Sequence, residues 1–173
     1  MDGTLVLFYG FGGLAVASAL VCITRRSPVA SALWLVVTLF SVAALFVLLD
    51  AQFLAVLQVL VYAGAIMVLF LFVIMLLNLG RAGPTDLRGP LGLAVGVFLA
   101  GLLFVQLLAL RQAGPDAQAG LPSGTMARVA AEQGMVPAVA RPLFSTYLVP
   151  FEITSMLLLA AIVGAVVLAK RRL

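Results

Sequence analysis

The stretch that decides the fold runs from residue 53 to residue 79 and reads FLAVLQVLVYAGAIMVLFLFVIMLLNL. It carries no formal charge, and its strongly polar side chains are Gln58 and Asn78, with a hydroxyl on Tyr62. At about 1.5 Å of rise per residue, a helix of this length crosses a hydrocarbon core of about 30 Å. We therefore predict a membrane-spanning helix over 53–79, with Gln58 and Tyr62 as polar groups that need an explanation.

The whole chain is too apolar to cover itself with a polar surface. Its 173 residues are 65% hydrophobic and 9% charged, whereas a soluble domain has about 25% charged residues. Apolar runs of about 20 residues predict helices, because backbone groups in lipid must be hydrogen-bonded within their own segment. We predict an all-α integral membrane protein, a single membrane domain over 1–173, with five spans: about 4–24, 29–49, 53–79, 91–110 and 147–169.

The basic residues predict the orientation of these spans. One side of the predicted layout holds most of them, namely Arg25, Arg26, Arg81, Arg88, Lys170, Arg171 and Arg172, and the other side holds Arg111, Arg128 and Arg141. The positive-inside rule then places the N-terminus outside and the C-terminus in the cytoplasm. A cleaved signal peptide is disfavoured, because no basic residue precedes the first apolar run.

The connections differ in length. The link at 50–52 is very short, so the second and third spans are predicted to be antiparallel neighbours. The link at 81–90 is rich in turn-forming residues. The outer loop at 111–146 is long, and we expect one short helix in it, over 125–133, closed by Gly134.

Composition also excludes several functions. The chain has no histidine and one cysteine, Cys22, so the usual protein ligands of haem, iron–sulfur clusters and structural zinc are absent. The basic residues form no patch, and we predict no nucleic-acid partner. No nucleophile–base pair or phosphate loop is visible. We expect a chain that binds no metal or cofactor and is not catalytic alone, with the lipid bilayer as a partner.

Gln58 and Tyr62 stand four residues apart and share one face of a helix. Tyr62 falls near the midplane, about 14 Å along the predicted span, and the small residues at 63–65 let another helix approach. Two interpretations stay open: a hydrogen-bonded contact between helices, or polar groups that hold a water chain for proton transfer.

Two acids and several small residues complete the candidate sites. Glu152 follows Pro150, so it is either a first-turn acid favoured by the helix dipole or a titratable group at the membrane edge. Asp50 is interpreted as a solvated turn acid. Small residues four apart favour close helix packing, and they occur at Gly13/Ala17, Gly92/Gly96 and Ala160/Gly164.

Three motifs resemble one family. Residues 57–78, with the core VYAGAIMVLF, are similar to the third helix of the J-subunit family of bacterial NADH–quinone oxidoreductase, the counterpart of subunit 6 of mitochondrial complex I. The SPV sequence at 27–29 resembles the family's motif before the second helix. The segment 143–159, LFSTYLVPFEITSMLLL, resembles the family's opening of the fifth helix.

The resemblance implies a core subunit in the membrane arm of a proton-pumping oxidoreductase of the bacterial cytoplasmic (inner) membrane. NAD, FMN, iron–sulfur clusters and quinone would then bind to other subunits. The implied partners are the small K subunit, the quinone-site subunit and the antiporter-like subunits.

The family's third helix can also carry a π-bulge that converts to regular helix and gates a water path. On this chain the bulge would span Tyr62 to Val68, with Gly64 easing the backbone change. Gln58 stands where many relatives have glutamate. Because an amide does not titrate, we expect Gln58 to orient water rather than carry a proton.

Two other functions remain open from the residues alone. One is a small transporter or a subunit of a cation–proton antiporter, which the midplane polar groups would suit. The other is a structural membrane adaptor that only packs other subunits.

Overall fold

The computed structural model describes residues 3–77, 90–112 and 125–170, and all regular structure in these ranges is helical. The chain divides into two compact units, residues 1–123 and 124–173, and each is described by itself. Several predicted features lie outside the described residues: the end of the third span at 78–79, the link at 81–89, the loop segment 113–124, and Arg171 and Arg172.

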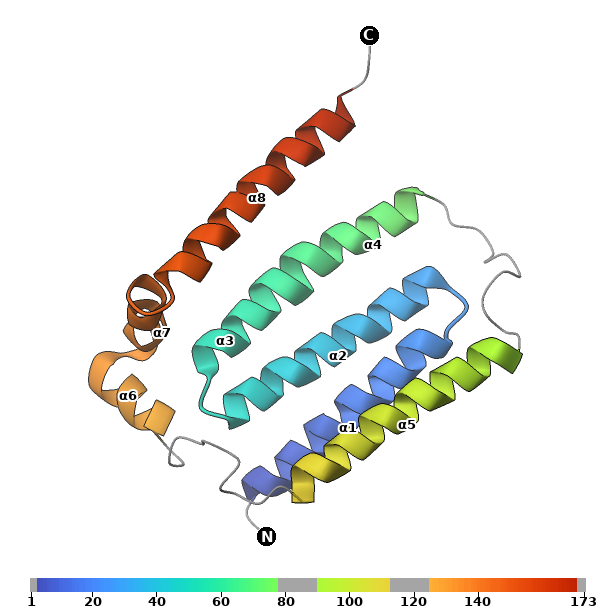
Figure 1. Cartoon of the computed structure of the whole chain (residues 1–173), viewed down its shortest axis with the longest axis horizontal. Helices are drawn as coiled ribbons and strands as arrows, with labels where there is room; N and C mark the ends of the chain where they lie inside the picture. The colour runs from blue at the N-terminus through green and yellow to red at the C-terminus, as the bar shows by residue number, and fades with distance from the viewer. Residues whose placement is uncertain (1–2, 78–89, 113–124, 171–173) are drawn as a thin grey trace. The chain divides into compact units, whose positions relative to one another are not determined.

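Three antiparallel helical rods pack side by side in the first unit (Figure 1). Helix α1 spans Gly3–Thr24 and α2 spans Pro28–Leu48. The third rod consists of α3 (Gln52–Leu57), the π-helix η1 (Gln58–Ile66) and α4 (Met67–Leu76). Helix α2 lies in the middle, since it contacts α1 as well as every segment of the third rod. The predicted neighbours, the second and third spans, are therefore confirmed.

The sequence SPV at 27–29 explains where α2 begins. Ser27 is the N-cap, and its hydroxyl accepts a long hydrogen bond from the Ala30 N–H at 3.5 Å. Pro28 occupies the first helical position, where the missing N–H costs nothing and the fixed φ suits the helix. The motif is thus a helix start after the short 25–27 connection.

Hydroxyl groups join α1 to α2. The Ser18 and Thr38 oxygens lie 2.8 Å apart, and Ser18 is almost fully buried. Nearer the 25–27 connection, the Ser31 hydroxyl donates to the Cys22 carbonyl oxygen. These contacts link one helix to the other at two heights, so α1 and α2 form a pair fixed by polar as well as apolar packing.

The turn after α2 is closed by backbone hydrogen bonds. The Ala51 N–H donates to the Phe46 carbonyl at 2.9 Å, and the Asp50 N–H donates to the Val47 carbonyl at 3.1 Å. This is the Schellman pattern, which places the residue after the helix cap in the left-handed region. Asp50 takes that place with φ 59°, a conformation that aspartate tolerates better than most residues. The exposed Asp50 is a turn residue, as predicted.

Helix α5, Pro90–Gln112, carries the fourth apolar run. Among the described residues it contacts no other helix. In the part of the chain that the structure describes, four helical rods are long and apolar enough to cross a membrane: Gly3–Thr24, Pro28–Leu48, Gln52–Leu76 and Leu148–Ala169. The described apolar part of α5, Ala94–Leu110, is shorter. The chain is thus an all-α membrane protein, and the fifth span and the orientation of the termini stay predictions.

The second unit begins with the predicted short helix, α6, which spans Thr125–Gln133 and is followed by Gly134 at φ 86°. Helix α7, Met135–Phe144, was not predicted, because its two prolines are typical of a loop. Helix α8 spans Leu148–Ala169. The rings of Phe144 and Phe151 meet edge to face with centroids 4.9 Å apart, which joins α7 to α8.

Candidate functional site

The middle of the third rod is a π-helix of nine residues, Gln58–Ile66. At its end, the Met67 N–H donates to the carbonyl of Tyr62, five residues earlier. The structure therefore confirms π-helical geometry around Tyr62 and Gly64. Its bounds differ from the expected Tyr62–Val68, because it begins at Gln58 and Val68 lies in α4. π-Helical turns of this kind tend to occur at functional sites.

The buried residues of the third rod show what the π-helix does to the packing. Ala55, Ala63, Met67 and Ile74 are buried. Residues on one face of a regular α-helix recur at four and seven positions, which fits the last three of them. Ala55 and Ala63 are eight apart, one residue too many for two regular turns. The π-helix absorbs this extra residue and lets all four share one face.

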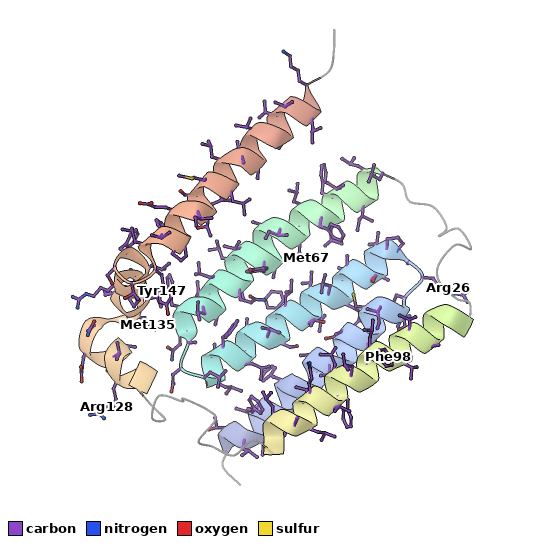
Figure 2. All side chains as sticks on the ribbon, in the orientation of Figure 1. Arg26, Met67, Phe98, Arg128, Met135 and Tyr147 are labelled. Atoms are coloured by element: carbon purple, nitrogen blue, oxygen red, sulfur yellow. The ribbon has the colours of Figure 1, made fainter. Side chains whose placement is uncertain are left out.

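That face packs on α2. Met67, labelled in Figure 2, forms a buried cluster with Ile74 and with Ala32 of α2. Partly buried apolar side chains from both helices surround it: Leu35, Val36, Leu39 and Leu71. The register of α4 is therefore tied to α2 by apolar contacts alone, which have no directional preference.

Gly64 lies against the backbone of its own π-helix. A Cβ at this position would lie 3.3 Å from the carbonyl oxygen of Val59, which is a tight contact. Glycine avoids it. The residue that Gly64 approaches is therefore Val59. We did not predict this contact, because only the five-residue spacing of a π-helix brings the two residues close.

Gln58 and Tyr62 both belong to the π-helix. Gln58 is its first residue and is half-buried, while Tyr62 is 53% exposed. Within the described residues, neither side chain forms a hydrogen bond to another side chain or to the backbone. Their polar groups are therefore available to water or to another chain rather than to a helix contact inside the described fold.

An apolar groove lies beside the π-helix. It has a volume of about 530 Å³ and is lined by residues of α2, α3 and η1: Phe40, Ala43, Ala44, Val47, Gln52, Ala55, Val56, Val59 and Leu60. Val59 and Leu60, from the first half of η1, thus border open space on this side.

Glu152 is exposed and stands at the fifth position of α8, which begins at Leu148. The interpretation as a first-turn acid is wrong, because the helix starts earlier than Pro150 and the favourable effect of the dipole falls off beyond the first turn. The Glu152 carbonyl accepts a hydrogen bond from Ser155 at 2.7 Å. Glu152 is the acidic residue of α8, a helix whose other polar side chains are Thr154 and Ser155.

The predicted packing glycines have no close partner in the described part of the chain. Ideal Cβ atoms at Gly13, Gly96 and Gly164 would meet nothing within 4 Å. Gly92 lies on α5, which packs on no described helix. Their role in close packing stays a prediction that concerns contacts with other chains.

These features define the class of protein: an all-helical, multi-pass membrane protein with a π-helix in its third rod. The chain matches the family described as NADH-ubiquinone/plastoquinone oxidoreductase chain 6 over residues 18–168. It therefore belongs to that family, and it is a subunit of the NADH–quinone oxidoreductase (complex I) type.

Individual relatives agree with this assignment. The chain is 41% identical to NADH-quinone oxidoreductase subunit J of Pseudomonas aeruginosa, over 91% of this chain and 92% of the relative. It is 36% identical to the subunit of the same name from Rhodobacter capsulatus, over 95% of this chain and 80% of the relative. It is also 36% identical to F(420)H(2) dehydrogenase subunit J of Methanosarcina mazei, over 92% of this chain and 89% of the relative.

Proposed function

We propose that this chain is a core membrane-arm subunit that helps couple quinone reduction to proton translocation, through a water path gated at the third helix. The observation that carries the proposal is the π-helix Gln58–Ile66, which holds Tyr62 and Gly64 at its centre. A gate here means a segment whose two backbone geometries place different side chains at the same point.

The two geometries differ in a way that the sequence defines. In a regular α-helix that continues from Ala55, Tyr62, seven residues on, lies almost directly in line with Ala55, whereas Ala63 lies about 80° around the axis. Conversion of the π-helix would therefore place Tyr62 where Ala63 is buried against α2. It would also turn the following residues by about 100° relative to those before the π-helix.

The composition of α4 makes the second geometry acceptable. After conversion, Ile66 and Val73 would take the places of Met67 and Ile74 opposite α2, and all four are apolar. Because α4 is apolar on every side, MVLFLFVIML, the exchange brings no polar side chain of α4 to the interface with α2. Tyr62, which the exchange moves to the same interface, brings a hydroxyl that needs water or another hydrogen-bond partner there.

The polar groups supply the path in this proposal. Gln58 orients water, Tyr62 gates it, and Glu152 is a titratable group at the membrane edge. The chain carries no redox centre itself: quinone, NAD, FMN and iron–sulfur clusters belong to other subunits. Relatives of the chain are named as subunits of an NADH–quinone oxidoreductase and of an F(420)H(2) dehydrogenase. Because these two enzymes take electrons from different donors, a subunit of the same family in both supports a role away from the donor site.

The proposal includes the membrane, the orientation and the partner subunits of the chain. The chain spans the bacterial inner membrane five times as one membrane domain, with the N-terminus outside and the C-terminus in the cytoplasm. Its partners are the K subunit, the quinone-site subunit and the antiporter-like subunits. Apolar surface supports this setting, since α8 buries none of its residues in the chain and its side chains project on all sides (Figure 2).

Gly64→Ala tests the gate. The added Cβ would press on the Val59 carbonyl, and alanine favours regular helix over glycine by about 1 kcal/mol. The contact with Val59 biases the segment towards the α geometry, while the propensity stabilises helical backbone relative to unfolded chain. We expect lower quinone reduction and lower proton pumping in membrane vesicles, in a complex that still assembles.

The matched control is Gly101→Ala, on α5, where a Cβ would meet nothing within 4 Å. This variant should retain both activities. A Gly64→Ala complex that assembles and pumps like the wild type would contradict the gate and leave the structural-adaptor function as the better hypothesis.

A further inference from the structure

A second groove runs along one face of α7, outside the site described above. It has a volume of about 580 Å³ and is lined by Val136, Pro137, Ala140, Arg141, Phe144 and Ser145. These residues form pairs that recur every four positions, which places them in one stripe along the helix. From residue 136 to residue 145 the stripe is about 14 Å long.

The groove combines an apolar wall with one cation. The apolar members come from both ends of the stripe, and Arg141 stands among them with an exposed side chain. Its Nη1 donates to the Gln133 Oε1 at 3.1 Å. A guanidinium group has five N–H donors, so this bond holds the group in place and leaves donors for an anion. The Ser145 hydroxyl donates to the Arg141 carbonyl at 2.8 Å.

The packing of α7 on α8 indicates where the groove lies relative to the bilayer. Phe144, at the end of the groove, packs edge to face on Phe151 of α8, and α8 is one of the helices able to span a membrane. Figure 1 shows α7 nearly end-on while α8 is seen along its length, so the two helices cross. With α8 across the bilayer, α7 lies along its surface, where amphipathic helices bind. Met135 and Tyr147 mark the two ends of this segment in Figure 2.

We propose that the α7 groove binds an anionic phospholipid, with the headgroup phosphate on the Arg141 guanidinium and part of an acyl chain along the apolar wall. Charge complementarity favours this occupant, since the planar fork of arginine suits phosphate oxygens. The groove thus offers both parts of a phospholipid a partner: one cation for the headgroup phosphate and an apolar wall for the acyl chain. The inference goes beyond the proposed function and needs only that α8 spans the membrane.

The test uses the full chain in its native membrane assembly and two photoactivatable lipids, phosphatidylglycerol and phosphatidylcholine, each with the reactive group on an acyl chain. We expect phosphatidylglycerol to label the segment 136–151 in preference to phosphatidylcholine. Arg141→Gln should lower the phosphatidylglycerol label about fivefold, the effect of about 1 kcal/mol per basic residue at an anionic surface. Arg128→Gln, the other described arginine of this unit, should leave the label unchanged.

A second variant covers the case in which Arg141→Gln fails to assemble. Ala140→Leu fills the groove and keeps the cation, so it should lower labelling by both lipids. Three results would overturn the proposal: equal labelling by the two lipids in the wild type, loss of the label when inorganic phosphate is added in excess, or cross-linking of the groove to another subunit in place of lipid.

Discussion

The hydroxyl oxygens of Ser18 and Thr38 lie 2.8 Å apart across the interface of α1 and α2. Each oxygen is also within hydrogen-bond distance of a carbonyl of its own helix, that of Ala15 for Ser18 and that of Trp34 for Thr38. A hydroxyl has one hydrogen to donate, so one of the two donates across the interface while the other donates to its own helix. The pair holds α1 against the helix on which the third rod packs.

Ser18→Ala should lower the free energy of unfolding by about 1 kcal/mol, because interhelical hydrogen bonds in membrane proteins contribute about 0.6 kcal/mol and up to about 1.7 kcal/mol. A double-mutant cycle with Thr38→Val should give a coupling energy of about 0.6 kcal/mol. Detergent-induced unfolding of the purified chain measures both. Thr24→Val is the control, since among the described residues the Thr24 hydroxyl bonds only to carbonyls of α1. A coupling of zero for the Ser18 pair would disprove the cross-helix bond.

Asp50 offers a test of the turn between α2 and α3. An L-residue in the left-handed region costs about 1–2 kcal/mol relative to glycine, somewhat less for aspartate. Asp50→Gly should therefore raise the free energy of unfolding by up to about 1 kcal/mol, and Asp50→Val should lower it. Proton pumping should not change in the glycine variant, because Asp50 is an exposed turn residue. A pumping defect in a stable Asp50→Gly complex would assign this carboxylate a function.

Patterns of spacing predicted much of the fold because they report on single helices. The apolar runs located the four long rods, and Ser27-Pro28 marked the start of α2. The short helix over 125–133 was predicted with its bounds. Helix α7 was missed since Pro137 and Pro142 weaken local helix preference, and packing on α6 and α8 outweighs that preference.

The candidate site was harder to predict from the sequence than the fold. Residues 58–66 have no composition that separates a π-helix from an α-helix, and its position came only from the family resemblance. A signal exists in the eight-residue separation of Ala55 and Ala63, but it becomes visible only once burial shows that both face α2. The first-turn interpretation of Glu152 was wrong because it depended on the exact first residue of α8, which sequence patterns do not define.

Glu152→Gln tests whether the carboxylate near the N-terminal end of α8 acts through its ionisation or through its size. The amide keeps the size of the carboxylate but does not titrate, and no first-turn dipole effect is lost, since α8 begins at Leu148. We expect fewer protons pumped per NADH oxidised, with normal assembly, and recovery in Glu152→Asp. Equal proton yields for the glutamine variant and the wild type would instead leave Glu152 as a contact residue.

Tyr62→Phe removes one hydroxyl from the centre of the π-helix and keeps the ring. Because Tyr62 is half exposed and its hydroxyl bonds to no described residue, the fold should tolerate the change with little loss of stability. We expect proton pumping to fall more than NADH oxidation does, since in the proposed function the hydroxyl orders water in the path and electron transfer belongs to other subunits. Vesicles assayed for both rates give the ratio directly.

Tyr9→Phe on α1 is the matched control, because it removes the same group from another exposed tyrosine. Its ratio of protons to electrons should equal that of the wild type. The double variant Gln58→Leu with Tyr62→Phe goes further, since it removes both polar side chains of the π-helix at once. If the complex with this double variant assembles and pumps fully, the π-helix serves packing alone; a lower ratio than in Tyr62→Phe places both side chains on the water path.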